Sequence, residues 1–406
     1  MARLRYAAAM AAMALGVSLA SVQVGSAQMG NGGGTAAGGP SGPASASAPV
    51  GPGLSRMPTT TPSVMPYLNT TGVPSAIDKA GSSTDGSVGG QAYGVNANYK
   101  WPYTTARVAI TGVGYNSTNP LLVPVASRPY RYTGKLWMRF GQSWFVCTAS
   151  LVKKGVVVTA AHCVHNYGAG QAGFANEVRF HPANAVNNVN NGGPYGFYRG
   201  VTWRVPTPYF NGTDTCQSGA IGVVCNNDIA TVTLAPKGGV YAGSAVGGWN
   251  GYSWNGYSFL ATPVFGNHTV GQITQLGYPV ALDGGAQMQR NDSYGKYIAM
   301  TGANGKQLRN TQLGSAMTGG SSGGPWMVNF GTRPVPSSSA SLGNASVSNT
   351  IVGVTSWGYT AVGINVQGAS WFGQNAEFPL ASYGAYGAGN IGKLMQDTCT
   401  GSAAYC

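Results

Sequence analysis

Three residues with the chemistry of a hydrolytic centre occur in this chain in the order His162, Asp228, Ser322. Each stands in a distinctive local sequence: T-A-A-H-C around the histidine, N-N-D-I-A around the aspartate and G-G-S-S-G-G-P around the serine. A serine hydroxyl is a poor nucleophile until a base removes its proton, and a histidine base needs an acid that fixes its tautomer. The three motifs therefore predict a Ser-His-Asp catalytic triad.

The sequence favours Asp228 over the three other aspartates that lie between the histidine and the serine. Asp228 opens a segment of alternating apolar residues, where a carboxylate would be partly buried and able to orient a base. Asp214, Asp283 and Asp292 stand in Gly- and Asn-rich stretches. We expect those three to lie in exposed turns.

Two adjacent serines, Ser321 and Ser322, compete as the nucleophile. Ser322 is followed by Gly-Gly-Pro and comes two residues after Gly320. Small residues let the backbone turn sharply, so that the N–H groups of Gly320 and Ser322 can both point at an oxyanion on the substrate. We therefore predict Ser322 as the nucleophile and these two N–H groups as the oxyanion hole.

Short apolar runs, separated by Gly, Asn and Pro clusters, must position these residues. Six runs have the pattern of β-strands: 135–140, 144–152, 155–159, 229–234, 271–276 and 350–357. Only a segment near 391–396 is expected to be helical. Many short strands with frequent turns indicate an antiparallel barrel or sandwich, and about 300 residues fit two packed barrels better than one.

The composition favours an exported protein rich in β-structure. Only 8% of the 406 residues are charged, and glycine alone contributes 64. The net charge of +13 reflects a scarcity of acids, since nine Asp and Glu residues stand against 22 Lys and Arg residues. The basic residues are scattered along the chain, so no tract indicates nucleic-acid binding.

The N-terminal part divides into two predicted segments. Residues 1–27 have the pattern of a secretory signal peptide, because Arg3 and Arg5 precede an apolar run that ends in small residues at Ala27. We therefore expect a secreted protein, extracellular or periplasmic, with no stable membrane insertion after cleavage. Residues 28–98 are dominated by Gly, Ser, Ala, Thr and Pro and cannot bury a core. They are either a disordered linker or a propeptide, and residues 99–406 are expected to form the folded domain.

Six cysteines in an exported chain imply disulfides. Their spacing favours three local pairs: Cys147 with Cys163, Cys216 with Cys225, and Cys399 with Cys406. The sequence contains no C-x-x-C or H-E-x-x-H motif, and its four histidines are not clustered with acids. We therefore expect neither a metal site nor a cofactor.

Together with S-W-G at 356–358, these motifs resemble the chymotrypsin/trypsin-like serine endopeptidases. The sequences P-Y-R-Y-T-G-K-L from residue 129 and G-Y-P from residue 277 also resemble the bacterial secreted branch that includes glutamyl endopeptidases. The resemblance covers residues 128–406. It implies an all-β fold of two six-stranded antiparallel barrels with the triad in the cleft between them. It also implies acylation at Ser322, with His162 acting first as base and then as acid, on protein or peptide substrates.

The resemblance assigns further residues to the site. The pair Cys147–Cys163 matches the bridge beside the family's catalytic histidine. Ser356, Trp357 and Gly358 would pair with the substrate backbone as an added strand. Trypsin-like members carry an aspartate directly before the nucleophile, and a freed N-terminal amine pairs with it on activation. A serine stands at that position here, which argues against activation through that ion pair.

The same comparison predicts the side-chain preference. Ala316 stands where trypsin-like enzymes that select Arg or Lys carry an acid. Thr355 stands where glutamyl endopeptidases carry a histidine. Neither of those preferences is therefore expected. Ala316, Met317 and Gly358 instead predict a neutral, largely apolar pocket that takes uncharged side chains.

Two other functions are compatible with the sequence. A chain of this fold could be a catalytically silent binding protein, because fold alone does not determine function. It could also be a surface-adhesion protein, since W-N-G-Y-S occurs twice in tandem at 249–258 and favours a hairpin whose aromatic residues could contact a partner. We expect a monomeric secreted serine endopeptidase.

Overall fold

The computed structural model describes most of the predicted folded domain. The described residues are 93–95, 100–108, 124–185, 188–191, 193–216, 224, 226–255, 260–262, 268–331, 347–359, 365–379 and 382–406. The predicted signal peptide and nearly all of segment 28–98 lie outside them. No helix among these described residues is long and apolar enough to cross a membrane.

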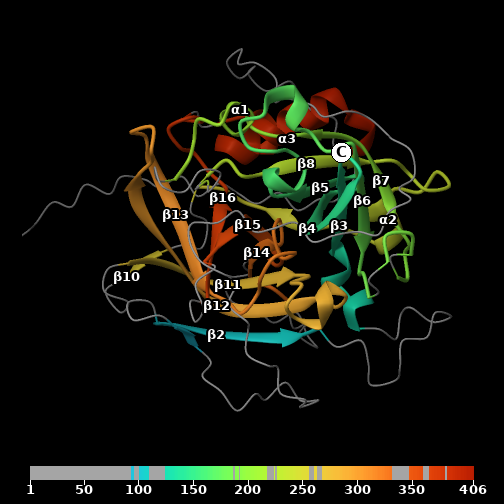
Figure 1. Ribbon diagram of the computed structural model, residues 1–406, viewed down its shortest axis with the longest axis horizontal. Helices are drawn as coiled ribbons and strands as arrows, with labels where there is room; N and C mark the ends of the chain where they lie inside the picture. The colour runs from blue at the N-terminus through green and yellow to red at the C-terminus, as the bar shows by residue number, and fades with distance from the viewer. Residues whose placement is uncertain are drawn as a thin grey trace, which may run out of the picture.

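The first barrel contains six antiparallel strands that close in the order β3-β4-β5-β8-β7-β6 (Figure 1). Their bounds are β3 Thr133–Phe140, β4 Ser143–Lys153, β5 Val156–Thr159, β6 Glu177–Pro182, β7 Tyr198–Arg204 and β8 Ala230–Leu234. Alternation explains the packing: Leu136 and Met138 belong to the barrel core, while Trp137 between them packs in a separate cluster. The barrel predicted around these runs is confirmed.

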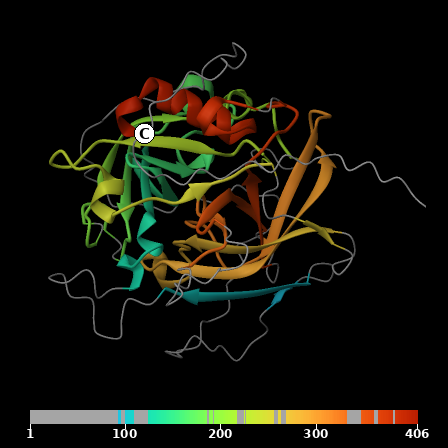
Figure 2. The same cartoon turned by 180° about the vertical axis from the view of Figure 1, so that it is seen from behind.

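The second barrel also closes with six strands, in the order β11-β12-β13-β16-β15-β14 and back to β11 (Figure 2). Their bounds are β11 His268–Gly277, β12 Gln289–Thr301, β13 Gln307–Gly314, β14 Pro325–Val328, β15 Thr350–Gly358 and β16 Val366–Trp371. Ile273, Leu313 and Trp326 are among the residues that fill its core. Two packed barrels were predicted from the length of about 300 residues, and the fold confirms them.

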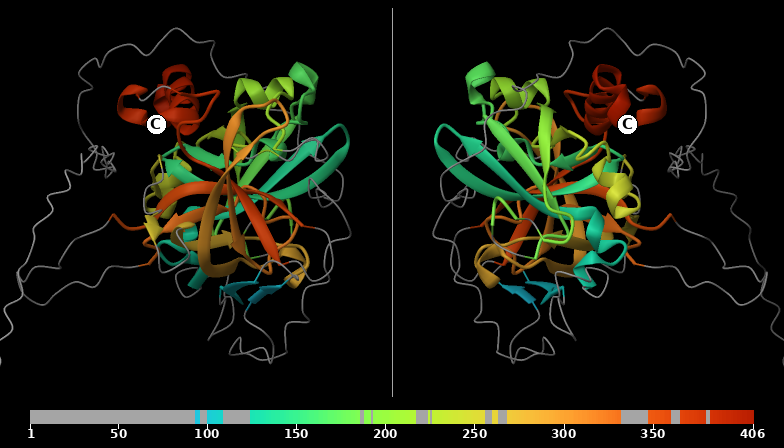
Figure 3. Two further views of the ribbon diagram at one scale, coloured as in Figure 1. Left: turned by 90° about the vertical axis from the view of Figure 1, so that its left-hand side faces the viewer. Right: turned by 90° about the vertical axis from the view of Figure 1, so that its right-hand side faces the viewer.

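Four short strands extend the second barrel. β2 (Lys100–Arg107) pairs with the outer edge of β12, and β1 (Tyr93–Val95) pairs with β2, as Figure 3 shows at the lower edge of the molecule. β10 (Leu260–Thr262) pairs with β11. β9 (Gly251–Tyr252) lies in the first W-N-G-Y-S copy and runs parallel to β15, whereas residues 256–258 of the second copy lie outside the described residues, so the predicted hairpin stays a prediction.

The predicted C-terminal helix is confirmed as α3 (Gly389–Gly401). Ile391, Leu394 and Met395 pack in one buried cluster with residues of both barrels, which joins the two halves. Two five-residue helices were not predicted, α1 (Thr207–Asn211) and α2 (Ala242–Val246). Both are too short to leave a 3.6-residue pattern in the sequence.

Short 3-10 helices complete the described structure. They are η2 Pro124–Ala126, η3 Tyr130–Tyr132, η4 Ala161–Cys163, η5 Gly170–Gly173, η7 Asp283–Gly285, η8 Gly384–Tyr386 and η9 Ala403–Tyr405. Among them, η4 carries His162 directly after β5.

Candidate active site

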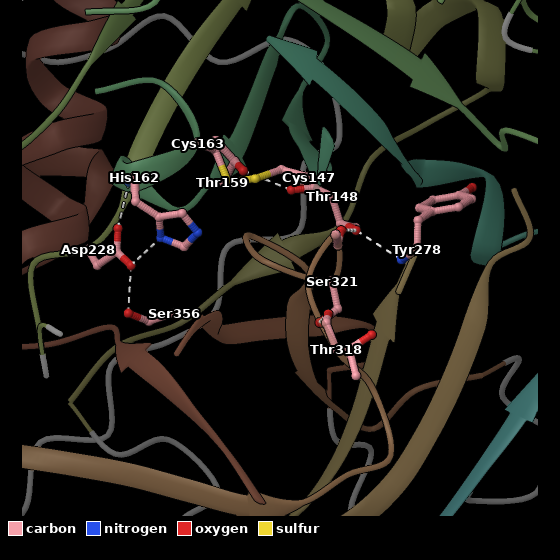
Figure 4. The surroundings of a disulfide bond; sticks show 11 residues. Cys147, Thr148, Thr159, His162, Cys163, Asp228, Tyr278, Thr318, Ser321 and Ser356 are labelled. Carbon is pink, nitrogen blue, oxygen red and sulfur yellow. Dashed lines mark hydrogen bonds and ion pairs between the residues drawn. A yellow bond between two sulfur atoms is a disulfide. The ribbon is translucent and has the colours of Figure 1, made fainter. Parts of the chain in front are cut away.

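Strand pairing in the first barrel brings His162 to Asp228. β5 pairs with β8 so that Thr159 lies opposite Ala230. This pairing brings His162, which follows β5, close to Asp228, which precedes β8. His162 Nδ1 lies 2.7 Å from Asp228 Oδ2, and the His162 backbone N–H donates to Oδ1 at 2.8 Å (Figure 4). The exposed fractions of the two residues are only 3% and 0%, so the pair is shielded from water.

The second barrel completes the surroundings of Asp228. The Ser356 hydroxyl donates to Asp228 Oδ2 at 2.6 Å, as Figure 4 also shows. The Asp228 backbone N–H donates to Ser370 Oγ at 3.0 Å. Ser356, on β15, was predicted to bind substrate through its backbone. Its side chain is hydrogen-bonded to the Asp228 carboxylate. Ser370 on β16 was not predicted, because a serine within a strand carries no signal of this contact.

These contacts determine which ring nitrogen of His162 can accept a proton. The Asp228 carboxylate accepts from a backbone N–H and a hydroxyl, which matches the acceptor-only character of an ionised carboxylate. A neutral His162 that donates its Nδ1 proton to this carboxylate has a free lone pair on Nε2. Nε2 is thus the atom that can take a proton from a nucleophile.

The loop between β13 and β14 holds Ser322 against the first barrel. We call it the nucleophile loop, after the predicted nucleophile Ser322. The Thr148 N–H donates to the Ser322 carbonyl at 2.8 Å. Gly323 has φ +77°, and a Cβ there would lie 2.0 Å from Thr159 Oγ1, so only glycine allows the loop to approach the end of β5 so closely. Among the described residues, no hydrogen bond joins Ser322 Oγ to His162 Nε2. Such bonds are often long in unliganded hydrolases and tighten with substrate.

The backbone around Gly320 is held in one orientation. The Gly319 carbonyl accepts from Val280 N–H at 2.8 Å, and the Gly320 carbonyl accepts from the Thr148 hydroxyl at 2.8 Å. A trans peptide places its N–H opposite its C=O, so the Gly320 N–H points away from Val280. Within the described part of the chain, neither this N–H nor that of Ser322 donates a hydrogen bond. Both remain available to an oxyanion.

The predicted substrate-binding residues lie beside this loop. Ser356, Trp357 and Gly358 end strand β15, where its pairing with β16 shifts register after Thr355. Trp357 packs closely on Gly368, since a Cβ at that glycine would lie 2.0 Å from the indole ring. Ala316 and Met317 are buried in the segment that leads to the nucleophile loop.

Two of the three predicted disulfides are confirmed, Cys147–Cys163 and Cys399–Cys406. Cys225, the predicted partner of Cys216, lies outside the described residues, so that pair stays a prediction. Cys147, His162 and Cys163 are the one group among the described residues with metal-ligand atoms close together. The sulfurs of Cys147 and Cys163 are bonded to each other, so they do not offer thiolates to a metal.

Asp214 corrects one expectation, because it is buried rather than exposed, with an exposed fraction of 1%. Its backbone N–H donates to the Tyr167 hydroxyl at 3.1 Å, and the turn between β12 and β13 contacts the next residue, where Ala303 N–H donates to the Thr215 carbonyl at 3.1 Å. Asp292 also differs, since it lies within β12 and not in a turn. Of the four aspartates, Asp228 alone contacts His162, and its role as the orienting acid stays a prediction.

Asp214 should make stability depend on pH. Burial, and next the nearby carboxylate of Glu377, raise the pKa of Asp214 to about 8. The folded state therefore keeps a proton that the unfolded state loses near its ordinary pKa of 3.8. Between these values the free energy of unfolding falls as pH rises, by about 1.4 kcal/mol per pH unit from this group.

We therefore expect Asp214→Asn to be increasingly more stable than the parent as pH rises from 4 to 8. Thermal and denaturant unfolding across this range would measure the difference. Asp292→Asn, at a side chain that is 36% exposed, is the control and should show no such trend. A constant stability difference at every pH would contradict the assignment.

Comparison with known families agrees with this geometry. The family model described as Trypsin matches residues 124–369, more than half of the chain. The chain belongs to the trypsin family. This trypsin-family protein is a serine endopeptidase, as the sequence motifs predicted. No match is found among curated proteins.

Several solved structures are similar to this trypsin-family chain. A thermostable serine protease, AL20, from an extremophilic microorganism is 24% identical, with a TM-score of 0.43 over 60% of this chain and 92% of that one. The protease Anisep from Arthrobacter nicotinovorans is 22% identical, with a TM-score of 0.42 over 60% and 91%. A Glu endopeptidase in complex with MPD is 16% identical, with a TM-score of 0.40 over 74% and 96%.

Proposed function

We propose that this protein is secreted and hydrolyses peptide bonds through an acyl-enzyme on Ser322. The observation that carries the proposal is the buried His162–Asp228 pair, with a 2.7 Å contact from Nδ1 to Oδ2. It lies where the Ser322 loop docks against the first barrel through Thr148. The two observed disulfides suit an oxidising compartment and support secretion.

The first half of the reaction acylates the enzyme. Ser322 Oγ attacks the carbonyl carbon of the scissile bond while His162 Nε2 takes the hydroxyl proton. The carbonyl oxygen becomes an oxyanion, which accepts from the N–H groups of Gly320 and Ser322. The intermediate collapses, the C–N bond breaks, and His162 gives its proton to the departing amine. Asp228 stabilises the imidazolium that forms between these two proton transfers.

The second half releases the acid product. A water molecule takes the place of the amine and attacks the ester carbonyl, again with His162 Nε2 as the base. The second tetrahedral intermediate expels Ser322 Oγ, which recovers its proton from His162. The enzyme returns to its starting state, and the backbone of Ser356–Gly358 holds the substrate as an added strand during both halves.

Burst kinetics test this proposal directly. With an activated ester in excess, the parent should release one equivalent of leaving group per enzyme rapidly, followed by slower turnover. Ser322→Ala should give no burst, whereas the matched control Ser244→Ala, at a serine on the exposed side of α2, should keep the full burst. A folded parent without a burst would instead support a catalytically silent binding protein.

We further propose that the pocket beside Ala316 and Met317 accepts uncharged side chains. The residues predicted to line this pocket carry no charge: Ala316, Met317 and Gly358. An ionised side chain placed there would lose hydration without gaining a partner, which costs about 3 kcal/mol. We therefore expect kcat/KM for peptides with an uncharged residue before the cleaved bond to exceed that for Lys or Glu peptides by about 100-fold.

A library of peptides that differ only at this residue would measure the preference. Replacing Ala316 with aspartate should raise kcat/KM for the Lys and Arg members relative to the uncharged ones. Efficient cleavage after Lys or Glu by the parent would contradict the proposed preference, while leaving the acyl-enzyme mechanism intact.

A further inference from the structure

A network of uncharged polar side chains is buried directly beneath the nucleophile loop. Its members come from three strands of the second barrel and from the loop itself: Gln275 on β11, Thr355 on β15, Gln367 on β16, and Ser315 and Ser321 before the nucleophile. Polar groups are kept in such a place only when their hydrogen bonds are made.

Gln275 lies at the centre of this network. Its Nε2 donates to Thr355 Oγ1 at 2.8 Å and to Gln367 Oε1. Its Oε1 accepts from the Ser315 hydroxyl at 2.8 Å. Both ends of the amide are therefore used, which fixes its orientation and, through it, the orientation of Gln367.

Gln367 ties the loop to the barrel. Its Nε2 donates to the Met317 carbonyl at 2.8 Å and to Ser321 Oγ at 3.2 Å. Ser321 Oγ in turn donates to the Thr318 carbonyl at 2.6 Å. The Gln367 amide thus holds both Met317, at the predicted specificity pocket, and Ser321, directly before the predicted nucleophile.

Thr355 holds the far end of the same loop. Its hydroxyl donates to the Gly324 carbonyl at 3.3 Å and accepts from Trp326 Nε1 at 3.0 Å. Its backbone carbonyl accepts from Gly323 N–H at 2.7 Å. The stretch from Ser315 to Gly324, which includes both predicted oxyanion donors, is therefore anchored on each side of Ser322.

We infer that the Gln275–Gln367 network is the device that holds the nucleophile loop in its competent form. Trypsin-like members have an aspartate at the position of Ser321, which pairs with a freed N-terminal amine. The Ser321 hydroxyl carries no charge and cannot form this ion pair. The amide network supplies the restraint from within the second barrel. Formation of the oxyanion hole therefore does not depend on a free N-terminal amine. The inference rests on the proposed function, since it concerns how the same site is made competent.

The first test blocks the N-terminus of the purified secreted parent. An aldehyde reagent selective for α-amines would be used, with complete modification verified by mass, and kcat would be measured on a peptide substrate. We expect kcat to stay within twofold of the untreated enzyme. A loss of more than tenfold would overturn the inference. Failure of an untreated parent that carries no N-terminal extension to turn over would instead contradict the proposed function.

The second test removes the donors of Gln367. Gln367→Met keeps the size of the side chain but leaves the Met317 carbonyl and Ser321 Oγ without this donor. Because the oxyanion N–H groups act mainly in the transition state, we expect kcat to fall at least tenfold with KM changed less than threefold.

The matched control is Gln307→Met, whose amide donates to Thr301 Oγ1 on the exposed β12–β13 hairpin. It should leave kcat unchanged. A folded Gln367→Met enzyme with parental kcat would overturn the inference. If Gln367→Met does not fold, the N-terminal modification, which needs no substitution, still decides.

Discussion

Replacing Ser322 with alanine is expected to lower kcat for peptide hydrolysis by about a million-fold. The substitution removes one oxygen atom, and with it the only group on the docked loop that His162 can activate in the proposed mechanism. The loop should keep its position, because its contacts with Thr148 and Thr355 run through backbone atoms of Ser322 and Gly323. Some acceleration over water should persist, since the oxyanion donors and substrate binding remain.

Steady-state kinetics with an active-site-titrated parent would measure this loss. Ser244→Ala, on the exposed surface of α2, controls for the serine-to-alanine change and should retain full activity. Far-ultraviolet circular dichroism and Tm would show whether Ser322→Ala is folded. A folded Ser322→Ala enzyme with more than a hundredth of parental kcat would mean that another residue is the nucleophile.

Replacing Asp228 with asparagine is expected to lower kcat by about ten-thousand-fold. The carboxylate now faces His162 Nδ1 at 2.7 Å and favours the tautomer with its proton there. An asparagine amide could donate to Nδ1 instead, which would move the imidazole proton to Nε2. His162 could then no longer accept the Ser322 proton. The side chain keeps its size, and its remaining oxygen, at the Oδ1 position, can still accept from the His162 backbone N–H.

The matched control for this substitution is Asp292→Asn, which lies on β12 and contacts Arg290 instead of the catalytic pair. Its kcat should lie within threefold of the parent. Burst kinetics would show that acylation itself is slowed in Asp228→Asn, because the burst phase should become too slow to separate from turnover. A kcat within tenfold of the parent in a folded Asp228→Asn protein would contradict the assigned role.

The sequence was sufficient to predict those elements whose pattern repeats locally. Ala230, Val232 and Leu234 alternate with Thr231 and Thr233, and this period of two marks a strand whatever its partners are. The short apolar runs at 135–140 and 155–159 are typical of strands without such alternation. The segment near 391–396 was the one expected to be helical, and it lies in α3. Local pattern therefore predicted the strands, the length of about 300 residues predicted two barrels, and the three motifs predicted the triad order.

Other features depend on partners that are distant in the chain. Asp214 is buried in surroundings that include groups distant in the chain, such as Tyr167, whose hydroxyl accepts from the Asp214 N–H, and Glu377. Ser370 reaches the backbone of Asp228 from β16, and nothing around it in the sequence indicates that contact. Helices α1 and α2 are too short to show a period. Tertiary contact, rather than local propensity, determines each of these.

The amide network illustrates the same limit within the site itself. Gln275 and Gln367 stand 92 positions apart, and each reads in the sequence as an ordinary polar residue of a strand. Their importance arises only because β11 and β16 both face the nucleophile loop from inside the second barrel. The sequence predicted what Ser321 cannot do, and the structure indicates which side chains provide the restraint instead.

The most direct test of the central claim is the intact mass of the purified protein after treatment with a fluorophosphonate, followed by peptide mapping. The parent should gain a single adduct, located on Ser322, and Ser322→Ala should gain none, because only an activated serine oxygen displaces fluoride from such a reagent. An adduct on another residue, or no adduct on a folded parent that carries no N-terminal extension, would contradict the account.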